Sequence, residues 1–138
     1  MTGDAAFLAL YREKRQRLSL LRSRMAHLSD DGAPSGVTGF RAERQRGTND
    51  PLAARMQLLD GLEEEAEHLA AEVSAMEQRF HGIAGLFPEG SRERDILHLY
   101  YRLGQPDAMC AGCMGVSVRH ACRLRHRMLE GMDERTAN

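Results

Sequence analysis

Residues 91–132 read SRERDILHLYYRLGQPDAMCAGCMGVSVRHACRLRHRMLEGM, and this stretch decides how the rest of the chain is interpreted. A first apolar segment stops at residues 104–106, a short helical segment ends at Gly115, and a last helix opens after Ser117. Pro106 suits the first turn of a helix, where its missing N–H would have no partner anyway. Gly115 can adopt the left-handed conformation that ends a helix, and the Ser117 hydroxyl can cap the next one. The stretch therefore predicts a compact helix-turn-helix.

The last helix is predicted to have two chemically different sides. Its apolar residues recur at 3- and 4-residue steps, which indicates a buried stripe made of Ala121, Leu124, Met128 and Met132. The charged residues between positions 116 and 129 are all basic or histidine: Arg119, His120, Arg123, Arg125, His126 and Arg127. The arginines at 119, 123 and 127 form a row that suits a DNA major groove, where arginine pairs with guanine edges or phosphates. The plainer alternative is a solvated basic face on a surface helix.

The order of these motifs carries a family resemblance. The segment opens with Arg-x-x-x-Ile-Leu-x-Leu-x-Tyr, continues with a short helix ended by glycine, and reaches Val-Ser before the last helix. In this it resembles region 4 of bacterial sigma-70-type factors. The whole layout is an N-terminal helix, a Gly/Ser-rich break, an acidic helix and this module. It is similar to the RinA/ArpU-like phage late-gene transcription regulators, which are small sigma-like activators.

The resemblance implies a DNA-reading role for the last helix. By it, Val118, Arg119, His120 and Arg123 face base edges, and Arg127 contacts the DNA backbone. The predicted DNA-binding residues are Ser117, Val118, Arg119, His120, Arg123 and Arg127. The implied partners are double-stranded DNA and host RNA polymerase. The segment 107–114 departs from the family pattern, because it lacks the usual glutamates and contains the helix-weakening Gly112.

Charge is strongly segregated along the chain, although the net charge of the 138 residues is only −1. Residues 12–24 are basic, with Glu13 as the only acid, whereas residues 60–77 contain acidic residues and no Lys or Arg. Segregation of this kind is more informative than the total. It favours pairing of these two segments with each other.

Two long helices are predicted before the module. In residues 4–28 the apolar seam is Phe7, Tyr11, Leu18, Leu21, Met25 and Leu28, interrupted by Lys14. In residues 51–83 the seam is Leu59, Leu62, Ala66, Leu69, Val73, Met76, Phe80 and Ile83, in strict 3- and 4-residue steps. Such seams predict a coiled coil. An antiparallel hairpin within one chain is the simplest pairing, and a homodimer through the same seam is the competitor. A basic arm lying on nucleic acid is the alternative for the first helix.

Between these helices, residues 29–50 lack periodicity and are rich in glycine, so they predict a flexible linker. Their arginines at 41, 44 and 46 leave a phosphate-contacting arm as the alternative reading. No apolar run approaches the length of a membrane span, and no signal-peptide core is present. Three cysteines clustered late in the chain form no disulfide framework, which favours a reducing cytoplasm, the host's if the protein is phage-encoded.

Two groups of residues suggest a metal site or a catalytic site, but neither has the spacing that such a site needs. Cys110 and Cys113, with His120, Cys122 and His126 nearby, invite a zinc site, but the second half lacks the usual ligand spacing. The glutamates of residues 63–67 point in different directions around a helix and do not converge as a catalytic pair should. We therefore expect no metal, no cofactor and no enzymatic activity.

The sequence thus predicts an all-α protein in two parts. Residues 1–83 form a helical hairpin or coiled coil, and residues 84–138 form a sigma-region-4-like helix-turn-helix. The predicted function is sequence-specific DNA binding in transcription, as a sigma-like activator of phage late genes. The alternatives are a coiled-coil protein–protein adaptor, in which the helix-turn-helix is structural, and a DNA-binding subunit for phage genome packaging.

Overall fold

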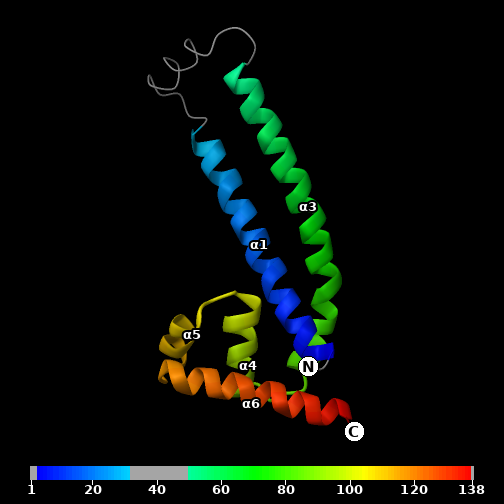
Figure 1. The fold of residues 1–138 in the computed structure, drawn as a ribbon, viewed down its shortest axis with the longest axis vertical. Coiled ribbons are helices and arrows are strands. Elements are labelled where there is room, and N and C mark those ends of the chain that lie inside the picture. The colour runs from blue at the N-terminus through cyan, green and yellow to red at the C-terminus, as the bar shows by residue number, and fades with distance from the viewer. Residues whose placement is uncertain (1–2, 32–49, 138) are drawn as a thin grey trace. The chain divides into compact units, whose positions relative to one another are not determined.

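The computed structural model describes residues 3–31 and 50–137, and in these ranges the protein is all-helical and has no strand (Figure 1). The helices are α1 (Gly3–Asp31), α3 (Pro51–Ala84), α4 (Arg92–Ile96), the π-helix η1 (Leu97–Arg102), α5 (Asp107–Met114) and α6 (Val118–Ala137). This confirms the predicted all-α class with two long N-terminal helices, and the sigma-region-4-like helix-turn-helix stays a prediction. Most of the predicted linker, including its three arginines, lies outside the described residues. In the described ranges, no helix combines the length and apolar character needed to cross a membrane.

The chain divides into two compact units, and α1 and α3 each contribute to both. The module unit contains Met1–Arg17 and Glu72–Asn138, and the hairpin unit contains Leu18–Ala71. The start of α1 and the end of α3 therefore belong with the C-terminal helices. The predicted division into domains 1–83 and 84–138 stays a prediction.

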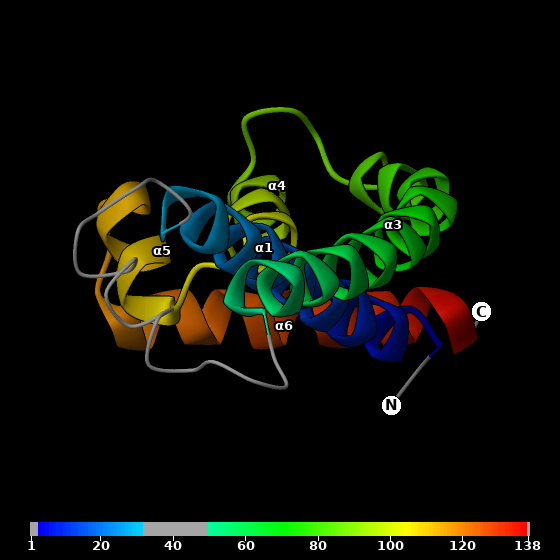
Figure 2. The same cartoon turned by 90° about the horizontal axis from the view of Figure 1, so that it is seen from above.

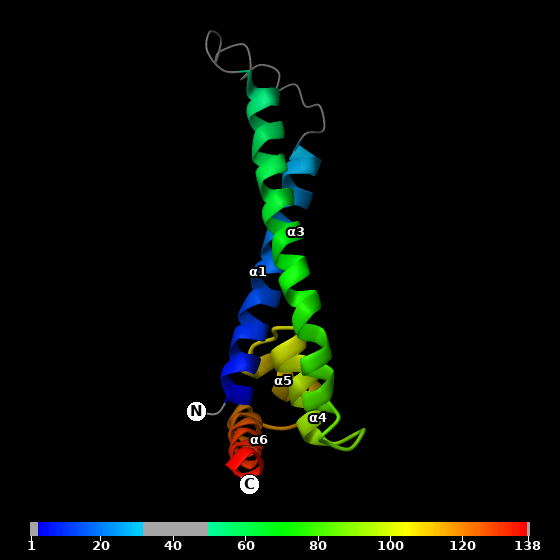
Figure 3. The same ribbon diagram turned by 90° about the vertical axis from the view of Figure 1, so that its right-hand side faces the viewer.

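Within each unit α1 and α3 run in opposite directions and meet through the predicted seams (Figures 1 and 3). In the module unit the Tyr11 and Phe80 rings stack with their centroids 4.5 Å apart, and both side chains are buried. In the hairpin unit the buried seam residues are Leu18, Leu21, Ala66 and Leu69. Lys14, the polar break in the first seam, forms an ion pair with Glu72 of α3. The antiparallel pairing of α1 and α3 within each unit agrees with the predicted helical hairpin.

The module unit buries residues on a second side of α1. Leu8, which is not a seam residue, is fully buried together with Tyr11. The C-terminal helices contribute Ile96, Leu97, Tyr101, Cys110, Ala111, Ala121, Met128 and Met132 to this core. Figures 1 and 2 show that α6 crosses the axis of α4 instead of running along it, and α6 contacts both α4 and α5. The predicted stripe of α6 is confirmed, because three of its residues are buried and Leu124 is half-buried.

The helix ends of the module follow the predicted signals. The N–H of Arg94 donates to Ser91 Oγ over 3.3 Å, and the N–H of His120 donates to Ser117 Oγ over 3.1 Å. Gly115 ends α5 in the left-handed conformation, with φ 70° and ψ 31°. One detail differs from the prediction, because Pro106 lies immediately before α5 instead of in its first turn.

Gly104 provides a sharp test of how α1 fits the module. It has φ +69°, and an added Cβ would lie 2.7 Å from Gln16 Cγ. We expect Gly104→Ala to lower the free energy of unfolding by about 1–2 kcal/mol, because both the backbone and the contact are strained. Gly112→Ala is the matched control, because its Cβ would meet nothing within 4 Å inside a helix. It should stabilise the protein by about 0.5–1 kcal/mol. Urea unfolding measures both, and effects of the same sign would contradict the prediction.

Candidate nucleic-acid interface

The predicted DNA-binding residues lie together on the exposed side of α6 and at its start. Ser117, Val118, Arg119, His120, Arg123 and Arg127 are all exposed, whereas the stripe on the other side of the helix is buried in the module core. Arg119, Arg123 and Arg127 lie on one side of the helix, since residues four apart lie one above the other, whereas Ser117, Val118 and His120 are exposed at its start. We call these six residues the outer face of α6. His126 is also exposed beside the row, and Glu130 is the first acidic residue after it.

Arg125 does not belong to this face. Its side chain is only 15% exposed and forms an ion pair with Asp107 of α5. Its guanidinium carbon lies 4.0 Å from the centroid of the Tyr100 ring. Burial alone would lower the pKa of this guanidinium, but hydrogen bonding to Asp107 and the nearby Tyr100 raise it. Arg125 therefore fixes α6 to α5 and η1.

Arg12 of α1 also contacts the Tyr100 ring. The guanidinium carbon of Arg12 lies 4.0 Å from the ring centroid, and Arg12 Nε donates to the Tyr100 carbonyl over 2.9 Å. Arg15 Nε donates to the Arg102 carbonyl over 2.6 Å, and Gln16 Nε2 donates to the Gly104 carbonyl over 2.9 Å.

These carbonyls lie at and just beyond the end of η1, where the helix has no internal donors left for them. Cationic side chains at a helix C-terminus also interact favourably with its dipole. Arg12 and Arg15 thus hold α1 against the module. This supports the packing interpretation of the first helix over a basic arm on nucleic acid, at least for these two residues.

Glu77 of α3 is the acidic centre of this contact. Its Oε1 accepts a hydrogen bond from the Tyr11 hydroxyl over 2.8 Å and one from Arg15 Nη1 over 3.0 Å. Its Oε2 is buried and accepts no hydrogen bond from any described residue, although Arg102 Nη2 lies 3.9 Å away. Burial first, and then the hydrogen bond to Glu77, raise the pKa of Tyr11 to about 12.

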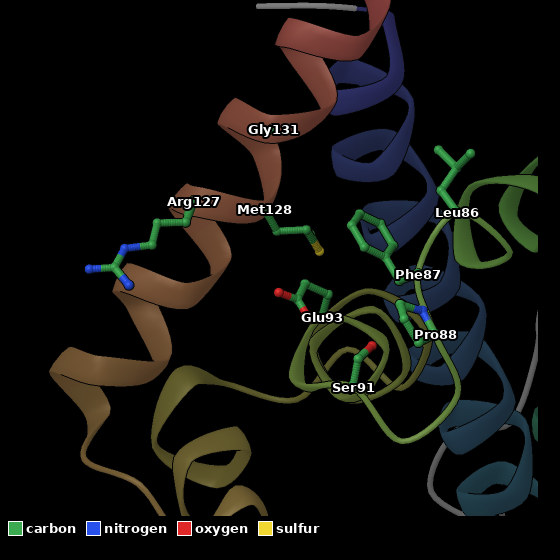
Figure 4. Close-up of a pocket in the computed structure, with 8 residues that line it drawn as sticks. All are labelled: Leu86, Phe87, Pro88, Ser91, Glu93, Arg127, Met128 and Gly131. Atoms are coloured by element: carbon green, nitrogen blue, oxygen red, sulfur yellow. The ribbon is translucent and has the colours of Figure 1, made fainter.

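An open groove of about 430 Å³ lies beside the outer face. Its lining residues are Leu86, Phe87, Pro88, Ser91, Glu93, Arg127, Met128 and Gly131. Figure 4 shows the Met128 side chain pointing toward Phe87, whereas the Arg127 side chain extends away from the groove. The Arg127 guanidinium is therefore directed outward, as a DNA contact requires.

The cysteines lie in three different environments. Cys110 is buried, and its thiol donates to the Gln105 carbonyl over 3.7 Å, while Cys113 is exposed and Cys122 is intermediate. Burial raises the pKa of the Cys110 thiol. In the part of the chain that the structure describes, no three His, Cys, Asp or Glu side chains are placed to hold a metal ion.

The comparisons with known proteins add no relative to this picture. No protein-family model, no curated protein and no solved structure matches the chain.

Proposed function

We propose that this protein is a sequence-specific double-stranded DNA-binding protein that reads the major groove with the outer face of α6. The observation that carries the proposal is the contrast among the arginines of this helix. Arg119, Arg123 and Arg127 are exposed, whereas Arg125 is part-buried and fixes the helix in place. A rigidly held helix with an outward cationic row can dock in a groove about 12 Å wide, as a recognition helix does.

Three further features support docking by the start of α6. The first turn presents Val118, which is 47% exposed and can contact a thymine methyl group. Ser117 caps the helix by accepting from the N–H of His120, and the start of a helix is a place where a phosphate is favoured. No acidic residue occurs between Ser117 and Leu129, so the phosphate backbone meets no like charge along these turns.

The biological role that we propose is transcription regulation, with host RNA polymerase as a partner and activation of phage late genes as the outcome. This step depends on the resemblance of residues 92–132 to sigma region 4. It requires no catalytic step, and it places the protein in the cytoplasm with its DNA.

The test is a fluorescence-anisotropy titration of duplex DNA from the native genomic neighbourhood, repeated across salt concentrations with a scrambled duplex as competitor. We expect tight binding that the scrambled duplex does not compete away. The affinity should fall steeply between about 50 and 200 mM salt, because bound arginines release counterions. Absence of binding at low salt would overturn the proposal.

Substitutions at Arg123 and Arg127 should have different effects. Arg123→Ala should cost about 1–3 kcal/mol on the cognate duplex and relax base preference, because a base-edge contact is lost. Arg127→Ala should weaken binding to all duplexes alike and reduce the salt slope by about 1, because a phosphate contact is lost. The same titrations measure both. Small and equal effects on cognate and scrambled DNA would contradict the docking.

A second candidate function is protein binding by the module itself, which differs from the predicted coiled-coil adaptor. One observation favours it, which is the open groove beside α6 with the exposed Leu86 at its edge. A protein partner in this groove would tolerate charge reversal at Arg119 and Arg123, because neither residue lines it. DNA binding would not tolerate that change. Double charge reversal therefore separates the two functions in one pair of binding assays.

A further inference from the structure

A second groove lies in the hairpin unit, between α1 and α3. Its volume is about 210 Å³, and it is lined by Arg22 and Met25 of α1 and by Glu63, Ala66, Glu67 and Ala70 of α3. Ala70 is small and half-buried, so the backbone of another helix can approach closely here, whereas Ala66 is already buried in the seam with α1. Small residues at a helix contact shorten the distance between axes, which varies with the side chains that meet.

The same side of α3 remains apolar beyond the groove. Leu52 and Met56 precede Glu63 and Glu67 by 11 residues each, which is three turns of a helix, so they lie on the same side. They are 63% and 56% exposed. In the part of the hairpin unit that the structure describes, no side chain covers these two residues. Contiguous exposed apolar side chains mark interaction sites in soluble proteins.

The charges at the two edges of the groove have opposite signs. Arg22 lies on the α1 edge, and Glu63 and Glu67 lie on the α3 edge; all three are exposed. Among the described residues, none of the three forms an ion pair. The surface is therefore complementary to itself, which is the property that a two-fold symmetric dimer needs.

We infer that the hairpin units of two copies of this chain dock face to face through this groove and form a four-helix bundle. The two-fold axis runs parallel to the helices, so that α1 of each copy lies over α3 of the other. Arg22 of one copy then meets Glu63 and Glu67 of its partner, twice in each dimer. The other face-to-face arrangement, with the axis across the helices, would place Arg22 against Arg22 and is excluded by like charge.

This dimer differs from a coiled coil in which the long helices exchange partners, because the seam within each hairpin stays intact. It also does not depend on the proposed DNA binding. The α6 outer face belongs to the module unit and shares no residue with the groove.

The test uses the full chain and two complementary variants, Arg22→Glu and Glu63→Arg/Glu67→Arg. Sedimentation velocity should show a dimer for the unmodified protein. Each variant alone should have a dimer dissociation constant at least about tenfold higher, because each dimer then contains two like-charge contacts. An equimolar mixture of the two variants should recover a heterodimer, since both contacts then pair opposite charges: one has the native signs and the other has the signs exchanged.

The mixture protects the test against misfolding, because a misfolded variant could not restore the dimer. Arg24→Glu and Glu64→Arg are matched controls, since both residues are exposed and neither lines the groove. These two variants should sediment as a dimer with the same dissociation constant as the unmodified protein. A monomeric unmodified protein at a few hundred micromolar, or a mixture that stays monomeric, would overturn the inference.

Discussion

Arg125→Ala is expected to lower the free energy of unfolding by about 2–3 kcal/mol, which is a large effect for a residue on a helix with several exposed arginines. Its guanidinium is the part-buried partner of Asp107, and removing one member of such a pair leaves the other charge without compensation. The stacking of Arg125 on Tyr100 is lost as well, at about 0.5–1 kcal/mol. Because α6 is then less firmly held on α5, affinity for DNA should also fall.

Chemical unfolding followed by circular dichroism measures this effect, with Arg123→Ala as the matched control. Arg123 is exposed, so its replacement should change stability by no more than about 0.5 kcal/mol. Arg125→Lys should give an intermediate loss, because lysine keeps the charge but not the planar group that pairs and stacks. If Arg125→Ala and Arg123→Ala unfolded at the same denaturant concentration, the structural role of Arg125 would be wrong.

The helices and their ends could be predicted because their causes are local. Ser117 and Gly115 each act on backbone groups within a few residues, and the structure has both as predicted. The seams follow from the steps of three and four between apolar residues, which depend only on the helical repeat. The π-helix η1 has no comparable sequence signal, so it appears as part of an ordinary helix in the prediction.

The supports of α6 could not be predicted, because they join residues far apart in the sequence. Spacing separates Arg125 from the row of Arg119, Arg123 and Arg127, but its partner Asp107 lies 18 residues away. Arg12 reaches the Tyr100 carbonyl across 88 residues. A basic segment that closes the end of a distant helix has the same composition as one that binds phosphate. Only the packing of α1 on the module distinguishes the two.

Alkaline pH is expected to remove a large part of the stability of the module unit. Burial is the main cause that raises the pKa of both Tyr11 and Tyr101 from 10 to about 12. Both side chains are nearly inaccessible, with exposures of 0% and 4%, so water does not offset the cost of burying their charged forms. A tyrosine whose pKa is higher in the folded protein than in the unfolded chain stabilises the folded state. This contribution is complete at any pH below the pKa of the unfolded chain. This contribution is lost as the pH rises toward the folded pKa.

The loss should therefore begin near pH 10 and be complete above pH 12. A pKa that rises from 10 to about 12 on folding corresponds to about 2.7 kcal/mol of the free energy of unfolding for each tyrosine, or roughly 5 kcal/mol for both. Urea unfolding at a series of pH values measures it. Tyr11→Phe should halve the alkaline loss, while costing about 1 kcal/mol at neutral pH through the hydrogen bond to Glu77. The double variant Tyr11→Phe/Tyr101→Phe should remove this tyrosine contribution altogether. If the double variant lost as much free energy of unfolding at alkaline pH as the unmodified protein, the pH dependence would come from other groups and not from these two hydroxyls.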